Sequence, residues 1–165
     1  MNPTRLKTGD ILHCTGHKRL SKIIRKFTKS KFSHSALFIE IWGQAYIIDA
    51  QNDGVNLRPF SEWQRTYGYD FVIHRSNKGF DEKELSIRAL TKVGNTAYDF
   101  ESLILKHPWT IITNSSWKLK KDQYERMTCS EFVAWVYGTE RSYRISPEDL
   151  HNWCLINNFS IIKLD

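Results

Sequence analysis

Cys129 is the residue of this 165-residue sequence with the clearest potential for chemistry. Thr128 and Glu131, three positions apart, match a capping box and predict a helix whose first residue is Cys129. The helix dipole and the unpaired N–H groups at that end stabilise a thiolate and could hold the oxyanion of a tetrahedral intermediate. Cys129 is therefore a candidate nucleophile. The alternative is a small buried hydrophobic residue, which is the role of most single cysteines.

A nucleophilic cysteine needs a base, and His34 is the best placed of the six histidines. It leads a predicted strand, and its neighbours Ser33 and Ser35 are small enough to leave room around an imidazole. Asp49, which ends the apolar run of residues 46–48, could orient that ring. The alternatives are a structural histidine and an acid at an exposed strand end, and the residues alone do not decide between them.

The expected hairpin of residues 35–50 constrains a contact between His34 and Asp49. A two-residue turn at Gly43-Gln44 would pair Asp49 with Phe38, roughly 13 Å along the strand from His34 at ~3.3 Å per residue. A direct contact would require a wider loop centred between Ile41 and Trp42. Both registers keep His34 and Asp49 on one face of the sheet.

The elements that would position these residues follow from hydrophobic spacing. Apolar residues predict strands at 10–12, 35–41, 45–50, 70–75 and 161–164. Helical spacing predicts helices at 17–31, 81–93, 98–105 and 128–137, and Ser146-Pro147 begins another. Residues 106–123 are expected to form a long loop or insertion. The fold class predicted is α+β, with a small antiparallel sheet packed against helices, in a single domain over residues 1–165.

Composition excludes several classes of protein. With 41% hydrophobic and 25% charged residues, the chain is neither disordered nor a low-complexity repeat. No apolar run approaches the ~20 residues that span a bilayer, and no signal peptide is visible, so we expect a cytoplasmic protein. Three cysteines in such a chain favour reduced thiols, and Cys14 and Cys154 are expected to be structural.

Five short motifs in one order resemble a known family. They are Gly9-Asp10-Ile11, Ser33-His34-Ser35, Asp49-Ala50 followed by Gly54-Val55, Tyr98-Asp99, and Cys129-Ser130-Glu131. This order is similar to that of the circularly permuted NlpC-like, papain-fold cysteine hydrolases of the YiiX type, in which the histidine precedes the cysteine. The third position is typically Glu in that family and is Asp49 here. The stretch between Tyr98-Asp99 and Cys129 is also longer than usual.

The resemblance implies a papain-like fold and a Cys–His–acid site. Cys129 would be the nucleophile, His34 the base and then the acid, and Asp49 the orienting residue. The implied reaction is acyl transfer through an acyl-enzyme on Cys129, with an amide of a cell-wall-type peptide as the expected substrate. A lipid-directed hydrolase or acyltransferase of the same fold is the alternative.

The N-terminal quarter of the chain is strongly basic. Residues 1–39 contain nine Lys or Arg and one acid, whereas residues 40–165 contain fifteen Lys or Arg and seventeen acids. Seven of the basic residues fall in the segment Lys18–Lys31, which could contact an anionic substrate, a membrane surface or the cell wall. We expect its apolar stripe to pack on the domain: Leu20, Ile23, Ile24 and Phe27. A solvated helix face and a non-catalytic anion-binding module are the alternatives, and no obligatory nucleic acid partner is predicted.

The remaining candidates are weaker. His13-Cys14 with His17 has a loose metal-ligand spacing, but three ligands without a fourth make a weak zinc site, so neither a metal nor a cofactor is predicted. Three tryptophans could line a binding groove or belong to the core: Trp63, Trp109 and Trp117.

Overall fold

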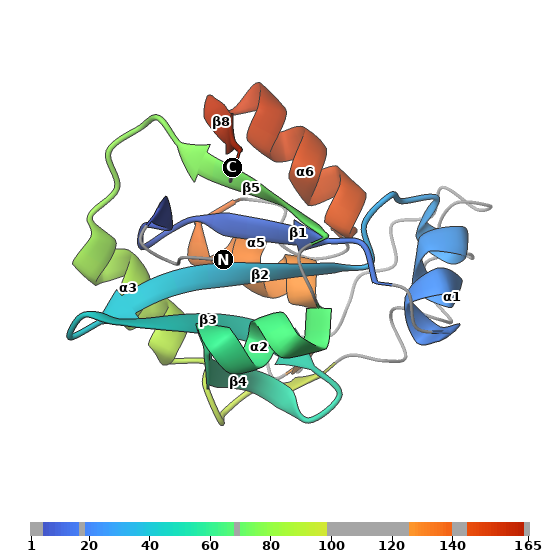
Figure 1. The fold of residues 1–165 in the computed structure, drawn as a ribbon, viewed down its shortest axis with the longest axis horizontal. Helices are drawn as coiled ribbons and strands as arrows, with labels where there is room; N and C mark the ends of the chain where they lie inside the picture. The colour runs from blue at the N-terminus through green and yellow to red at the C-terminus, as the bar shows by residue number, and fades with distance from the viewer. Residues whose placement is uncertain (1–4, 17–18, 68–69, 99–125, 140–144, 164–165) are drawn as a thin grey trace.

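A central antiparallel sheet organises the chain, as a computed structural model shows (Figure 1). The structure describes residues 5–16, 19–67, 70–98, 126–139 and 145–163. The strands are β1 (Ile11–Cys14), β2 (His34–Ile41), β3 (Gln44–Gln51), β4 (Gly54–Pro59), β5 (Phe71–Ser76), β6 (Ala97–Tyr98), β7 (Arg126–Met127) and β8 (Phe159–Ile162). The helices are α1 (Arg19–Thr28), α2 (Phe60–Tyr67), α3 (Glu82–Leu90), α5 (Cys129–Val136) and α6 (Pro147–Ile156).

Six strands form the main sheet in the order β4-β3-β2-β1-β5-β8, and every neighbouring pair is antiparallel. Side chains alternate between its faces. Ile11, Leu37 and Ile48 belong to the core shared with α3, α5 and α6, whereas Leu12 and Ile47 pack with Trp63 of α2. Figure 1 shows α2 and α5 on opposite sides of the sheet. The α+β fold class is confirmed.

Helix α5 begins where the capping box places it. The Thr128 side chain accepts a hydrogen bond from the Glu131 amide, and the Glu131 carboxylate accepts one from the Thr128 amide at 2.8 Å. Phe132 and Val133 are fully buried, and α5 packs against β2 and β3. The local start signal and the apolar face together hold Cys129 at the first helical position, beside the sheet.

Two elements of the structure, β4 and α2, are not predicted from the sequence. Strand β4 extends the hairpin of β2 and β3 by a further antiparallel pairing, and α2 follows it directly. Tyr98 lies in the two-residue strand β6, which pairs with β7, so the helix expected at 98–105 does not begin at Tyr98. The rest of that segment and the loop expected at 106–123 lie outside the described residues.

Helix α1 stands beyond the end of the sheet, next to the start of β2, and does not cover either face (Figure 1). The expected packing of its apolar stripe is wrong for Ile23, which is 43% exposed because no sheet surface lies under it. The side chains of Leu20, Ile24 and Phe27 lie outside the described residues. Among the described helices, none combines the length and the apolar character needed to cross a bilayer.

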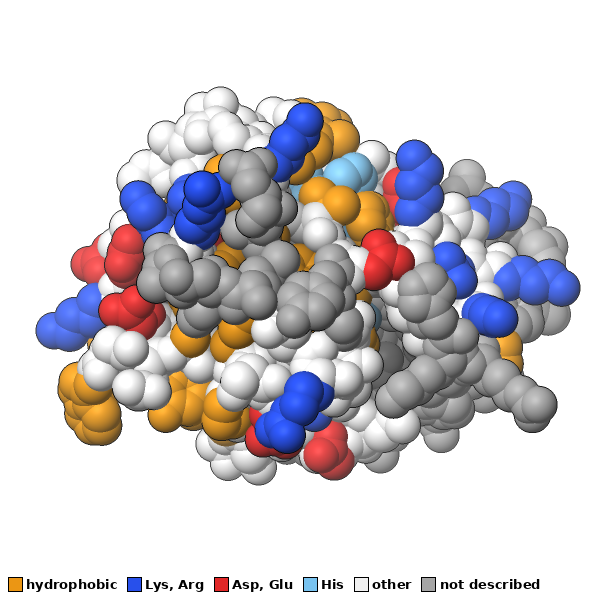
Figure 2. All heavy atoms as spheres, viewed as in Figure 1, with side chains coloured by type: hydrophobic (Ala, Val, Ile, Leu, Met, Phe, Trp, Pro, Cys, Tyr) orange, Lys and Arg blue, Asp and Glu red, His pale blue; other side chains and the backbone are white. Residues whose placement is uncertain are grey.

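Lysine side chains around α1 form an exposed basic patch. Lys22, Lys26, Lys29 and Lys31 are exposed, whereas Arg25 is half-buried. Figure 2 shows Lys and Arg side chains gathered at the end of the molecule where α1 lies. Five residues separate α1 from His34, so the patch is close to the first residue of β2.

The capping box of α5 yields a stability prediction. Thr128→Ala should lower the free energy of unfolding by about 1 kcal/mol, because the Glu131 amide loses its acceptor. Thr66→Ala, an exposed threonine near the end of α2, is the control and should change stability by less than about 0.5 kcal/mol. Chemical denaturation of both variants measures the difference, and equal effects would contradict the assigned cap.

Candidate active site

His34 and Asp49 are in direct contact. The Nε2 atom of His34 lies 2.7 Å from Oδ2 of Asp49, and both residues are buried. They come from neighbouring strands, His34 from the first position of β2 and Asp49 from near the end of β3. The structure therefore brings together these two residues predicted from the sequence.

The register that allows this contact differs from both registers considered from the sequence. Ile41 pairs with Gln44, so the two-residue turn is Trp42-Gly43, one position earlier than Gly43-Gln44. Both turn residues have positive φ, 50° at Trp42 and 74° at Gly43, as a type I′ turn requires. Continued along the strands, this register places Asp49 opposite Ala36, so His34 is its diagonal neighbour, about 7–8 Å away between Cα atoms. A wider loop is unnecessary because the side chains span the diagonal.

Asp49 accepts hydrogen bonds from three further donors. The Trp63 indole Nε1 and the Gln51 amide donate to Oδ2 at 3.0 and 2.8 Å, and Arg58 donates to Oδ1 at 3.0 Å. Burial raises the pKa of Asp49, but the hydrogen bond and charge of His34, together with the Arg58 charge, outweigh it and hold that pKa below its ordinary value. Asp49 is therefore a carboxylate inside the protein.

Tyr67 of α2 fixes the plane of the His34 ring. The two rings stack with their centroids 4.8 Å apart and an interplanar angle of 3°. Gln51, which donates to Asp49, also donates to the Tyr67 hydroxyl at 3.1 Å. The imidazole is thus held by Asp49 at Nε2 and by Tyr67 on its face, and Nδ1 is the nitrogen left for another partner.

Cys129 is that other neighbour of His34. Burial alone would lower the pKa of His34, but the Cys129 charge, the hydrogen bond to Asp49 and a side-chain hydrogen bond with Cys129 raise it to about 10. The Cys129 side chain is almost fully enclosed, with 3% of the residue exposed. The Cys129 side chain, at the first position of α5, is thus hydrogen-bonded to an imidazole that is itself bonded to a carboxylate.

The other two cysteines have different surroundings. Cys14 and Cys154 are fully buried free thiols. Burial is the main cause that raises the pKa of Cys14 well above its ordinary value, and it raises the pKa of Cys154 to about 12. Such thiols are inert, so the expectation that both are structural fits their environment.

The sequence does not predict the residues that hold Asp49 and His34 in place. Arg58 and Trp63 lie in the strand and helix that were not anticipated, and Gln51 and Tyr67 carry no motif. Trp63 is fully buried, so it belongs to the core and does not line a groove. Trp109 and Trp117 lie outside the described residues. Trp63 lies thirteen positions after the end of the strand predicted at 45–50, so the sequence holds no local signal that identifies it as a partner of Asp49.

The arrangement defines a class of protein. An antiparallel sheet carries the histidine, a helix packed on it carries the cysteine at its first position, and the histidine precedes the cysteine in the chain. This is the architecture of a circularly permuted papain-like fold. The chain belongs to the permuted papain-like amidase family YaeF/YiiX, C92, whose family model matches residues 5–152.

A solved structure has the same fold. The crystal structure of the metalloprotein YiiX from Escherichia coli O157:H7 is similar with a TM-score of 0.65 and 19% sequence identity, over 96% of this chain and 97% of that one. At this identity the likeness supports the fold alone. Among curated proteins, none matches this sequence.

The ionisation of His34 provides a pH prediction. Its pKa is 6.5 ordinarily and about 10 in the folded protein. Because the pKa is higher in the folded protein, protonation of His34 increases the free energy of unfolding. This contribution is complete below pH 6.5 and is lost as the pH rises through about 10. Imidazole NMR should therefore show His34 as imidazolium at pH 8. In Cys129→Ala the pKa should fall, because a charge that raises it is removed.

His74, whose pKa burial and the neighbouring His151 lower to about 4, should stay neutral over the same range and is the internal control. A His34 that is neutral at pH 7 in the wild-type protein, or a pKa that is identical in Cys129→Ala, would contradict the pairing of the two side chains.

Proposed function

We propose that the protein is a cysteine hydrolase in which Cys129 is the nucleophile, His34 the general base and acid, and Asp49 the residue that orients His34. The observation that carries the proposal is the position of His34 between a buried carboxylate 2.7 Å from Nε2 and the Cys129 thiol. A base that is itself oriented by a third group is the arrangement that activates a thiol for attack on a carbonyl carbon.

The reaction would proceed in two steps. The Cys129 sulfur attacks the carbonyl carbon, the oxygen takes the electron pair, and the amide C–N bond then breaks as His34 gives its proton to the leaving nitrogen. In the second step, neutral His34 takes a proton from water, the hydroxide attacks the thioester, and the C–S bond breaks to release the acid. Asp49 keeps Nε2 bonded throughout, so Nδ1 faces the reacting atoms.

The first turn of α5 is suited to the charge that develops on the carbonyl oxygen. The backbone N–H groups at a helix N-terminus point outward, and the helix dipole favours a negative charge there. Thr128 accepts from the Glu131 amide, which leaves the amides of Cys129 and Ser130 as the donors nearest the sulfur. The same helix would thus supply both the nucleophile and the oxyanion site.

We infer that the substrate is an amide and that the most suitable class is a cell-wall-type peptide. Membership of an amidase family supports the amide bond. The basic patch around α1 supports a substrate or surface that carries negative charge, since Lys22, Lys26 and Lys29 are exposed beside the strand that begins with His34. In this proposal the patch increases the rate of association and takes no part in the chemical step.

Replacement of the proposed nucleophile and base gives the direct test. Cys129→Ala should abolish turnover while the fold is kept, since Ala suits a helix and loses little volume. His34→Ala should reduce the rate by ~10²–10⁴-fold, the usual contribution of general acid–base catalysis. Mass spectrometry of wild-type protein after incubation with candidate peptides should reveal the acyl group on Cys129 and thereby identify the substrate.

Alkylation measures the thiol without a known substrate. Iodoacetamide at about pH 6–7 should modify Cys129 faster than Cys14 or Cys154, and His34→Ala should remove that preference. Full activity of Cys129→Ala on any substrate of the wild-type protein would disprove the mechanism. A trapped lipid acyl group would assign the enzyme to lipid substrates instead of peptides.

The basic patch has its own test. Changing Lys22, Lys26 and Lys29 together to Gln should raise KM and flatten its dependence on salt, with kcat nearly constant, because long-range attraction acts on association. The matched control changes three exposed lysines elsewhere, Lys78, Lys83 and Lys163, and removes the same charge. Equal effects of the two triple variants, or a fall in kcat alone, would contradict a role of the patch in association.

A further inference from the structure

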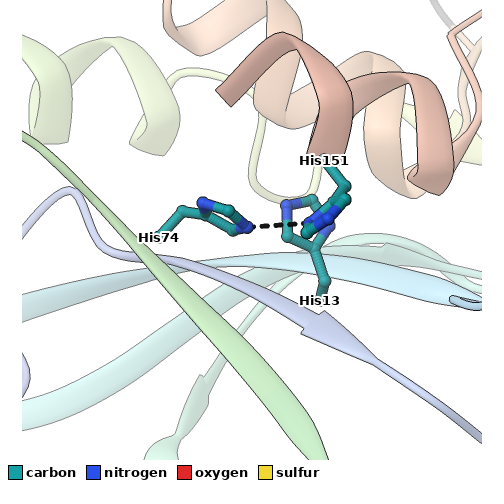
Figure 3. Close-up of side chains that lie close together, drawn as sticks. All are labelled: His13, His74 and His151. Atoms are coloured by element: carbon teal, nitrogen blue, oxygen red, sulfur yellow. Dashed lines mark hydrogen bonds between the residues drawn. The ribbon is translucent and has the colours of Figure 1, made fainter. Parts of the chain in front are cut away.

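Three histidines from distant parts of the sequence converge on the face of the sheet opposite Asp49. His13 comes from β1, His74 from β5 and His151 from α6, and Figure 3 shows the three rings directed toward one another. One ring nitrogen of each lies within 4.8 Å of those of the other two. His13 and His74 are fully buried and His151 is half-buried.

The strand geometry explains why these histidines meet. His13 pairs with Val72 across β1 and β5, so His74, two positions further along, is a diagonal neighbour on the same face. Side chains alternate along a strand, so Cys14 points to the other face, where it packs in the core beneath α2. His13 and Cys14 therefore cannot bind one ion together, and the ligand set suggested by residues 13, 14 and 17 is wrong for that reason.

The hydrogen bonding of the cluster leaves buried nitrogens unsatisfied. His74 Nε2 and His151 Nδ1 are 2.8 Å apart, and His13 Nδ1 lies 3.0 Å from Ser35 Oγ. Within the described residues, His13 Nε2 and His74 Nδ1 have no hydrogen-bond partner although both atoms are buried. Leaving a buried polar atom unsatisfied costs about 1–3 kcal/mol. Of these two atoms, His13 Nε2 is the one that an ion held between the three rings would satisfy.

We propose that His13, His74 and His151 form a binding site for a divalent first-row transition metal ion, with Zn²⁺ as the best-suited ion. His13 would bind through Nε2, His74 through Nε2 and His151 through Nδ1. Each ring would keep its single proton on the other nitrogen, so three neutral imidazoles bind without a net loss of protons. A water molecule would take the fourth position next to the half-buried His151.

The donor set selects the class of ion. Imidazole suits zinc and its neighbours in the first transition series, whereas magnesium and calcium require oxygen ligands. Three histidines and one open position match the four-coordinate geometry of zinc, in which ligand nitrogens ~2.0–2.1 Å from the ion are about 3.3 Å from one another. The nitrogens are separated by 2.8 Å to at most 4.8 Å, a range that includes this spacing.

The surroundings hold the rings as metal ligands are usually held. The hydrogen bond between Ser35 and His13 Nδ1 directs Nε2 toward the other two histidines, as an outer partner of a metal-bound histidine does. Phe32 packs against both His13 and His151, with ring centroids 5.3 and 4.9 Å apart. Burial lowers the pKa of all three histidines and thus disfavours the imidazolium form, which cannot bind a metal.

Metal titration of the full-length protein tests the proposal. After treatment with a chelator, ZnCl₂ added in a calorimeter should bind with one equivalent at micromolar or tighter affinity. His151→Gln and His74→Gln should each abolish this binding, and Ser35→Ala should weaken it ~10–100-fold. Cys129→Ala should bind zinc like the wild-type protein, which distinguishes this site from the thiol of the proposed active site.

The spectrum of bound cobalt reports the ligand atoms directly, and circular dichroism checks that the histidine variant is folded. Co²⁺ should give the absorption of a four-coordinate nitrogen and oxygen site without a thiolate charge-transfer band, and circular dichroism of His151→Gln should match that of the wild-type protein. Absence of zinc binding, binding that survives both histidine substitutions, binding lost in Cys129→Ala, or a thiolate band with Co²⁺ would each overturn the proposal. The cluster would then be a hydrogen-bonded part of the core.

Discussion

The buried carboxylate of Asp49 is the constraint on which the rest of the site depends. An ionised carboxylate without partners inside a protein is very unfavourable, and here four donors from β2, β3, β4 and α2 surround it. Those donors can reach it only if the type I′ turn sets the register of β2 and β3, if β4 pairs with β3, and if Trp63 packs into the sheet. The acid therefore specifies the local fold, and the fold in turn fixes the ring of His34.

The electrostatic balance extends from this carboxylate to the first turn of α5. His34 lies between Asp49 and Cys129, and its pKa of about 10 reflects negative charge on both sides that outweighs the effect of burial. The capping box matters for the same reason, since a shift in the start of α5 would move the sulfur away from the ring. Positions of the backbone, set by turn chemistry and by helix capping, thus control the charge of one imidazole.

The sequence predicts the parts of this arrangement that have local signals. Thr128 and Glu131 specify a helix start within four residues, and the alternating strand patterns assign His34 and Asp49 to the same face. The sequence does not predict the exact register, because Trp42 is an unusual residue for positive φ and the segment Trp42-Gly43-Gln44 allows more than one turn. Arg58 and Trp63 act through tertiary contacts only. The same holds for His13, His74 and His151, which meet through strand pairing and helix docking.

The distribution of the site along the chain has a consequence for the order of folding. His34, Asp49, Arg58 and Trp63 lie within thirty consecutive residues, with sequence separations of 15 and 14 between bonded partners. Short separations and a tight turn favour early formation, and this half of the protein also leaves the ribosome first. Cys129 follows much later and reaches His34 only when α5 docks. A nascent chain would therefore carry an assembled histidine–carboxylate pair well before the thiol of Cys129 is placed beside it.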